Sequence, residues 1–247
     1  MPPLPASPKP LVNGRCRNSL LARLSDDQFR QLQPHLKTVA LDPKQVLHKQ
    51  GDPVRFVYFP SGGIVSMATL LPDGSMLEAA TIGDEGMVGV EAFFSDDAVS
   101  ACETIVQVPI PNDSAERLAV GDFRRFMNAC PPFHQAIAGY IERVYAIMGR
   151  LMACNAHHAI DERCARWLLT MDDRMNGQDF HLSHEFLAAM LGVRRQTVSV
   201  VAGTLRTAGL IRYVHGRITI IDRKGLEAAA CDCYPAIRAL YERAKLR

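Results

Sequence analysis

The chain has 247 residues, of which 48% are hydrophobic and 22% are charged, and its formal net charge is +2. This length allows two domains, and the composition is that of an ordinary soluble protein. No apolar run approaches the length of a membrane span, so we exclude a transmembrane protein and expect no membrane partner.

The N-terminus and the cysteines indicate the compartment. Residues 1–17 begin with MPPLPASPKP, which is rich in proline and lacks the apolar core of a signal peptide, so we expect a disordered tail. The seven cysteines are scattered and odd in number, which argues against a disulfide framework. The sequence therefore predicts a protein of the reducing cytoplasm.

Residues 18–131 have the pattern of a mainly β domain after a helical entry. Ser25 is placed to cap a helix within residues 18–36. From Thr38 to about Val108, short runs rich in Val, Ile, Phe and Tyr alternate with turn sequences, which predicts a sandwich or barrel. The stretch from Leu71 to Ser75 predicts a hairpin turn between strands at 64–70 and 76–82.

A long helix is predicted at residues 132–158, and its apolar residues follow a heptad. Their spacing alternates between four and three, and β-branched Ile137 and Val144 at alternate seam positions favour a two-stranded parallel coil. The expected dimer seam consists of Phe133, Ile137, Tyr140, Val144, Ile147 and Leu151.

The same helix has a second possible use. An amphipathic helix of this kind can pack on its own β domain, and Ile141, Met148 and Met152 form a second apolar stripe. We therefore expect one face to pair with a second protomer and the other to lie on the β domain.

Residues 159–247 have the order of a winged helix-turn-helix followed by a C-terminal helix. After a helix from Ile160, Ser183 is a good N-cap for a short helix, and Gly192 marks a tight turn. A second helix then buries one face, and two β-rich runs at 210–214 and 217–221 predict a hairpin, the wing. The residues of the buried face are Val198, Val201, Ala202 and Leu205.

The charge of this region suits DNA. Between residues 181 and 224, seven basic and two acidic residues give a net charge of +5, whereas the whole chain carries only +2. The exposed face of the second helix carries Arg195 and Gln196, which can pair with guanine and adenine in the major groove.

The run from Gly192 to Ser199 (GVRRQTVS) resembles the recognition-helix motif of the Crp/Fnr superfamily of bacterial transcription regulators, and residues 205–221 (LRTAGLIRYVHGRITII) are similar to the helix end and wing of that family. The resemblance extends over most of the chain. It implies an α+β protein with an N-terminal, jelly-roll-like β-roll sensor domain, a dimerisation helix and a C-terminal winged helix-turn-helix. It also implies that the long helix relays between sensor and DNA-binding domains.

The resemblance implies roles for individual residues in DNA binding. We expect base contacts from Arg195, from Gln196, which stands where the family has Glu, and from Val200, which replaces a family Arg. The target should therefore differ from the family's usual half-site. The candidate phosphate contacts are Arg194, Thr197, Ser199, Arg206 and Arg217.

The sensor departs from the cyclic-nucleotide members of the family. Val90 falls where those members hold the sugar with a Glu, with Glu91 displaced by one position, and Val99 falls where an Arg holds the cyclic phosphate. Since Ser100 alone cannot neutralise a phosphate, we expect no cyclic AMP binding in the family's manner, with Arg55 as an alternative phosphate ligand. The expected effector pocket consists of Val90, Glu91, Val99, Ser100, Met148 and Met152.

Other cofactors have little support. An iron–sulfur sensor of this family needs several N-terminal cysteines, and only Cys16 precedes the β-roll. Haem has possible axial ligands, but lone His residues are usually just polar. Cys231 and Cys233 have no second ligand pair with zinc-finger spacing, so we expect no metal site. The possible haem ligands are His35, His48 and Met76.

Together these observations predict a homodimeric, sequence-specific regulator of transcription that binds a near-palindromic operator in double-stranded DNA, with RNA polymerase as a further candidate partner. The alternative is a ligand-binding or protein-interaction module whose winged helix no longer recognises DNA specifically. The sequence lacks Gly-x-Ser-x-Gly, P-loop and His-Glu-x-x-His motifs, so an enzyme is the weakest interpretation.

Overall fold

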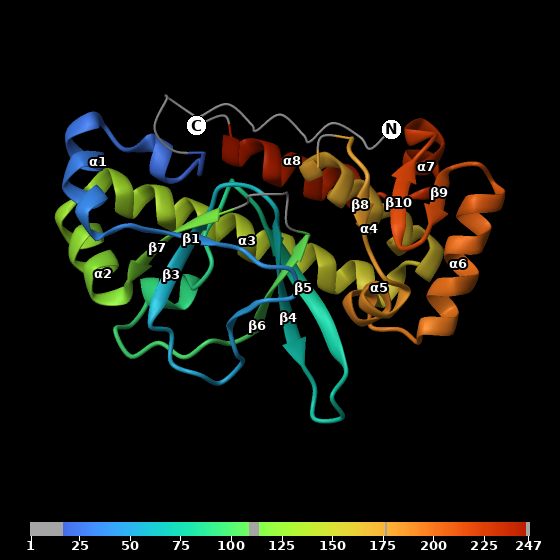
Figure 1. The fold of residues 1–247 in the computed structure, drawn as a ribbon, viewed down its shortest axis with the longest axis horizontal. Coiled ribbons are helices and arrows are strands. Elements are labelled where there is room, and N and C mark those ends of the chain that lie inside the picture. Colours follow the sequence, from blue (N-terminus) through green and yellow to red (C-terminus); the bar gives the residue numbers. More distant parts are fainter. Residues whose placement is uncertain (1–16, 109–113, 176, 246–247) are drawn as a thin grey trace. The chain divides into compact units, whose positions relative to one another are not determined.

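The computed structural model describes residues 17–108, 114–175 and 177–245, and it confirms the α+β class, with an N-terminal β domain, helices and a C-terminal helix-turn-helix (Figure 1). Except for Arg17, the predicted tail lies outside the described residues, as does Cys16. The chain forms two compact units. The first contains the described residues up to Ser66 and Ile82–Arg143, and the second contains Met67–Thr81 and Val144–Arg243.

The first unit starts with short helical segments. Ser25 caps α1 (Asp26–Leu32) through a capping box with Gln28, as its position predicts. The predicted helix is shorter than residues 18–36, because it is flanked by separate 3-10 turns. These are η1 (Leu21–Arg23) and η2 (Gln33–His35).

The strands form two sheets. The three-stranded sheet has the order β1-β7-β3 and the four-stranded sheet has the order β2-β6-β4-β5. The predicted hairpin is confirmed, with β4 at Ile64–Leu70 and β5 at Met76–Ile82. The other strands are β1 (Lys37–Ala40), β2 (Val46–His48), β3 (Phe56–Pro60), β6 (Glu103–Val108) and β7 (Ser114–Ala119).

Three further helices follow or interrupt these strands. The short 3-10 helix η3 (Val90–Phe93) lies between β5 and β6, and α2 (Val120–Ala129) follows β7. The long helix α3 runs from Pro131 to His157, where the heptad pattern predicts a helix. The boundary between the two units falls inside α3, between Arg143 and Val144.

The second unit is built around α4 (Ile160–Met175), which is almost wholly buried. Trp167 on α4 donates a hydrogen bond from Nε1 to the Glu78 carboxylate on β5, at 3.0 Å. This bond satisfies both polar groups inside the unit. The remaining elements are β8 (Phe180–His181), α5 (His184–Leu191), α6 (Arg195–Thr207), β9 (Ile211–Val214), β10 (Arg217–Ile220), α7 (Arg223–Ala229) and α8 (Cys233–Lys245).

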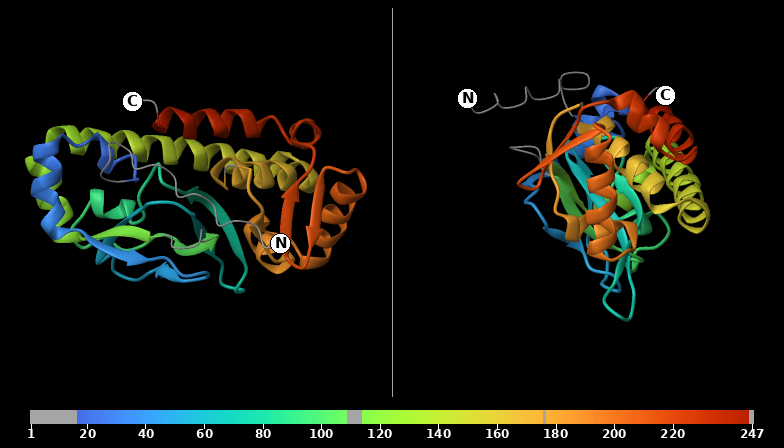
Figure 2. Two further views of the ribbon diagram at one scale, coloured as in Figure 1. Left: turned by 45° about the horizontal axis from the view of Figure 1, so that its top comes forward. Right: turned by 90° about the vertical axis from the view of Figure 1, so that its right-hand side faces the viewer.

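Strands β8, β10 and β9 form a small sheet in that order, next to α6 (Figure 2). Among the described residues, no helix is long and apolar enough to cross a membrane.

Candidate functional sites

The turn between α5 and α6 is fixed by local sequence. The Ser183 hydroxyl accepts a hydrogen bond from the Phe186 amide and caps α5. Gly192 ends α5 with a φ of 65°, and a Cβ here would lie 2.8 Å from Leu77 Cδ1. The positive φ calls for glycine, because other residues rarely adopt this backbone conformation, and a Cβ would also require the Leu77 side chain to shift.

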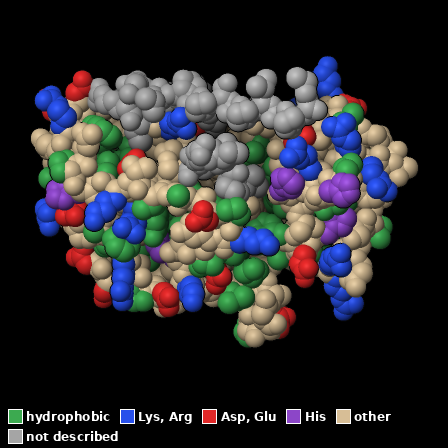
Figure 3. Space-filling view, in the orientation of Figure 1, with side chains coloured by type: hydrophobic (Ala, Val, Ile, Leu, Met, Phe, Trp, Pro, Cys, Tyr) green, Lys and Arg blue, Asp and Glu red, His purple; other side chains and the backbone are tan. Residues whose placement is uncertain are grey.

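Helix α6 has one buried and one exposed face. The four predicted core residues are 0–7% exposed, as their spacing predicts. Gln196 and Val200 lie on the opposite side, and Val200 is 69% exposed, while Arg195 is exposed as the first residue of the helix. Lys, Arg and His side chains gather on the surface over α6 and the wing (Figure 3). The helix therefore presents a basic and polar surface while its apolar side anchors it to the unit.

The α5 residue His184 connects α6 and the wing. Its Nδ1 lies 2.9 Å from the Ser199 hydroxyl, and its ring stacks on Tyr213 with 4.5 Å between centroids. Burial, with a smaller contribution from the positive charge of Arg195, lowers the pKa of His184. The sequence analysis missed this residue, because its partners are 15 and 29 positions away in the chain.

Ser199, a predicted phosphate contact, is engaged inside the protein. Its hydroxyl donates to the Arg195 carbonyl at 3.1 Å, so His184 Nδ1–H donates to the same oxygen. A hydroxyl has one proton to donate, and here it is used within the helix. In this conformation Ser199 positions α6 instead of donating to a phosphate.

The wing hairpin closes through His215 and Gly216, which have φ angles of 49° and 77°. Positive φ at both central residues matches the type I′ turn that two-residue hairpins favour. Arg217, a predicted phosphate contact, begins β10 beside two partners: its guanidinium lies 3.9 Å from the Asp179 carboxylate and 3.4 Å from His181 Nε2.

One basic residue of the region is not available to DNA. Arg223 forms ion pairs with Asp172, Asp173 and Glu227. Its charge is therefore neutralised within the unit. The net charge of +5 counted for residues 181–224 overstates the charge that phosphates would meet, since the pairing acids lie outside that range.

The prediction that the heptad seam of α3 faces a second protomer is wrong, because the seam is buried within one protomer. Phe133, Ile137, Tyr140, Val144, Ile147 and Leu151 are all 7% exposed or less within a single protomer. Tyr140, for example, donates a hydrogen bond to the Met87 carbonyl at 3.1 Å. Intramolecular and intermolecular helix packing use the same heptad spacing, and in α3 this spacing reflects packing inside the protomer.

The adjacent side of α3 carries a partly exposed stripe, which we define as Ile141, Tyr145, Met148 and Met152. Tyr145 is 80% exposed and Met152 is 72% exposed, while Ile141 and Met148 are half-buried. The spacing of four, three and four residues keeps all of them on one face. Three members belong to the second stripe recognised in the sequence, but Tyr145 was missed.

Within the first unit, the polar residues predicted for the effector pocket make local hydrogen bonds. Val99 is 50% exposed and Met152 points largely into solvent. The Ser100 hydroxyl donates to the Cys102 carbonyl at 2.7 Å, and the Glu91 carboxylate accepts from the Ala101 amide at 3.0 Å. Both polar groups therefore hold the loop together, and half-buried Val90 lies in η3.

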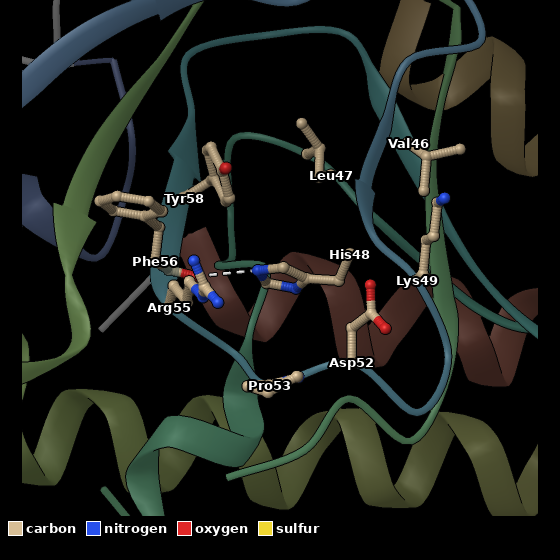
Figure 4. A pocket seen from close by; sticks show the side chains of 9 residues that line it. All are labelled: Val46, Leu47, His48, Lys49, Asp52, Pro53, Arg55, Phe56 and Tyr58. Atoms are coloured by element: carbon tan, nitrogen blue, oxygen red, sulfur yellow. Dashed lines mark hydrogen bonds between the residues drawn. The ribbon is translucent and has the colours of Figure 1, made fainter. Parts of the chain in front are cut away.

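A cavity of about 430 Å³ lies elsewhere in the first unit (Figure 4). None of the six predicted residues lines it, although Arg55, the alternative phosphate ligand, does. His48 Nε2 donates to the Phe56 carbonyl at 2.9 Å, while burial lowers the pKa of this imidazole. The lining residues are Val46, Leu47, His48, Lys49, Asp52, Pro53, Arg55, Phe56 and Tyr58.

The second unit also gathers four sulfur and nitrogen ligands. The ligand atoms of Cys154, His158, Cys231 and Cys233 all lie within 4.8 Å of one another. The expectation of no metal site rested on the lack of a second ligand pair with zinc-finger spacing, and the fold brings a second pair to Cys231 and Cys233 without such spacing. Cys154 and His158 supply that pair from the end of α3, 77 and 75 positions away in the chain.

Two domain families match this chain in the order of its two folds. Residues 38–118 match the cyclic nucleotide-binding domain, and residues 162–229 match the Crp-like helix-turn-helix domain. Together the matches cover more than half of the chain. The chain belongs to the Crp/Fnr family.

Individual relatives agree with this assignment. The transcriptional regulator LdrP of Thermus thermophilus is 27% identical over 202 residues, covering 76% of this chain and 93% of LdrP. The regulator SdrP of the same organism is 25% identical over 177 residues, covering 68% of this chain and 80% of SdrP. The chain is thus a Crp/Fnr-type transcriptional regulator.

Solved structures support the fold alone. FixK2 from Bradyrhizobium japonicum superposes with a TM-score of 0.66 at 19% identity, covering 79% of this chain and 98% of FixK2.

Proposed function

We propose that this regulator binds DNA sequence-specifically as a homodimer, with α6 in the major groove, and that its β domain does not bind cyclic nucleotides in the family's manner. The observation that carries the proposal is the exposed face of α6. Arg195 and Gln196 stand at its N-terminal end, and N-terminal residues of a recognition helix contact bases in helix-turn-helix proteins.

Discrimination between bases rests on three side chains. Arg195 is proposed to contact guanine and Gln196 adenine, while exposed Val200 suits the methyl group of thymine. Arg194 and Arg206 are exposed and are proposed phosphate contacts, together with Thr197 and the wing residue Arg217. Ser199 is not among the proposed phosphate contacts, because its hydroxyl donates to the Arg195 carbonyl within α6.

Dimerisation is proposed to use the exposed stripe of α3. Tyr and Met are enriched at protein interfaces, and exposed apolar side chains that repeat along a helix are typical of an unpaired coiled-coil face. The seam predicted from the heptad is buried in the protomer, so we propose that the stripe of Ile141, Tyr145, Met148 and Met152 forms the dimer interface instead.

The test is a pull-down of genomic DNA fragments by the full-length protein, followed by sequencing. We expect enrichment of a near-palindromic site with half-sites about one helical turn apart. Arg195→Ala should reduce this enrichment and relax the preference at one base pair of each half-site. The matched control is Arg238→Ala, which changes an exposed arginine of the same unit that pairs with Glu242 on its own helix. Uniform recovery of all fragments by the unmodified protein would support the alternative, an interaction module without specific DNA recognition.

A further inference from the structure

Four potential metal ligands meet at the end of α3, inside the second unit. Cys154 lies in the last turn of α3, and His158 directly follows the helix, with its amide bonded to the Cys154 carbonyl at 3.0 Å. The spacing of four residues therefore places both side chains on one side. Cys231 lies between α7 and α8, and Cys233 is the first residue of α8. The three thiols are 0–4% exposed and the imidazole is half-buried, so the group is largely shielded from solvent.

Two of the distances between ligand atoms match a tetrahedral site. Cys154 Sγ lies 3.5 Å from Cys231 Sγ, and Cys233 Sγ lies 3.7 Å from His158 Nδ1. In a tetrahedral zinc site, with Zn–S of about 2.3 Å and Zn–N of about 2.0 Å, neighbouring ligand atoms are about 3.5–3.8 Å apart. Since no pair of ligand atoms exceeds 4.8 Å, the group suits one ion better than a larger cluster.

The histidine is held as metal-bound histidines usually are. His158 turns Nδ1 toward Cys233, while Nε2 lies 3.2 Å from the Asp232 carboxylate. Metal-bound imidazoles typically donate the other ring N–H to a carboxylate, which fixes the tautomer and the ring orientation. Asp232 therefore supplies a partner outside the four ligands.

Two buried arginines lie near the group and can balance a negative charge on it. Three thiolates and one neutral imidazole around a divalent ion leave a net charge of −1. Buried Arg166 and Arg163 lie close enough to Cys154 to interact electrostatically with it. An anionic site in this position has compensating cations, as a buried charge requires.

We propose that Cys154, His158, Cys231 and Cys233 bind a single zinc ion. Binding displaces one proton from each of the three thiols and none from the neutral imidazole, and no electron is transferred. Three soft thiolates with one imidazole in tetrahedral arrangement form a set that zinc uses in structural sites. The ion joins the end of α3 to the start of α8, and so closes the segment that contains the helix-turn-helix and the wing.

The first experiment measures metal content. The full-length protein is produced with zinc in the medium, purified under anaerobic reducing conditions and analysed by elemental mass spectrometry. We expect roughly one zinc per chain. Cobalt exchanged into the site should give the visible absorption of a tetrahedral ion and a thiolate charge-transfer band, which a merely packed group of thiols cannot produce.

Matched variants separate ligation from folding. His158→Ala and Cys154→Ser should lose stoichiometric zinc, whereas His157→Ala and Cys130→Ser, which change a neighbouring histidine and a buried cysteine outside the group, should keep it. Asp232→Asn should weaken zinc binding by about 10–100-fold without abolishing it. Circular dichroism checks that each variant retains its helices.

Four results would overturn the proposal. The first is reduced protein that takes up no zinc when the ion is added. The second is iron with inorganic sulfide in place of zinc, and the third is undiminished zinc affinity in a folded His158→Ala protein. Isolation of a Cys154–Cys231 disulfide with no metal uptake after reduction would likewise replace the zinc site with a thiol pair.

Discussion

Helices α6 and α3 are both amphipathic, but they leave different surfaces exposed. On α6 the apolar side is buried and the other side is polar and basic. On α3 one apolar side is buried and a second apolar stripe remains exposed. A basic surface suits nucleic acid, and an exposed apolar surface suits another protein. The side of each helix that is not buried in the protomer therefore indicates the kind of partner that the helix binds.

The largest effect should come from charging the buried side of α3. Val144→Glu with Ile147→Glu places two carboxylates where the native side chains are 7% and 2% exposed. An unpaired buried charge costs several kcal/mol, and two approach the about 5–15 kcal/mol that stabilises a typical domain. We expect an unfolded or aggregated protein by circular dichroism and light scattering. A folded monomer would show instead that these positions form the dimer interface.

Charging the exposed stripe should separate dimerisation from folding. Tyr145→Glu with Met152→Glu changes side chains that are 80% and 72% exposed, so the protomer should keep its helical spectrum. Like charges brought together across a coiled coil oppose pairing, so light scattering should show monomers with much weaker operator affinity. A dimer of unchanged stability would place the interface elsewhere on the protein.

The contrast between these two experiments shows where sequence reasoning reached its limit. The spacing of Val144 and Ile147 correctly predicts an apolar helix face, but spacing is the same whether the partner is the same chain or another. Only burial in the folded protomer distinguishes the two. In α6 no such ambiguity arises, because Val198 and Leu205 belong to the single apolar face and Gln196 lies opposite.

The same limit explains the other outcomes. The cap at Ser183, the turn at Gly192 and the β4–β5 hairpin depend on neighbouring residues, and the sequence predicts each of them. The cavity around His48 and Arg55 and the group of Cys154 and Cys231 depend on contacts between distant segments. Spacing within one segment does not reveal such contacts.

On α6 itself, the base-reading and phosphate-binding roles can be separated. Arg195→Ala should cost about 1–3 kcal/mol on the selected operator and much less on scrambled DNA, because a bidentate contact with guanine is lost. Equal losses on both DNAs would remove Arg195 as a base reader. The measurement is a titration of both DNAs at fixed ionic strength.

Arg206→Ala should have a smaller and more even effect. Arg206 is exposed near the end of α6, away from the N-terminal residues that are proposed to contact bases. Loss of one phosphate contact should weaken binding to the operator and to scrambled DNA alike, and it should reduce the slope of log affinity against log salt by about one. A loss confined to the operator would make Arg206 a base reader.

The smallest expected effect is that of cyclic AMP, which should leave both the α3 interface and the α6 surface unchanged. Val99 supplies no charge for a cyclic phosphate, and the Ser100 and Glu91 side chains are held by Cys102 and Ala101. The loss of a charge-assisted bidentate contact weakens affinity by on the order of a hundredfold or more. Calorimetry with cyclic AMP and cyclic GMP, paired with operator titrations, should therefore show neither tight binding nor a gain in DNA affinity.

Arg55→Ala is the informative variant, because Arg55 lines the cavity of the first unit and could hold a phosphate there. Micromolar nucleotide binding that increases operator affinity and disappears in Arg55→Ala would show that the β domain binds the nucleotide through a different basic residue, and that the proposed independence of α6 from cyclic nucleotides is wrong.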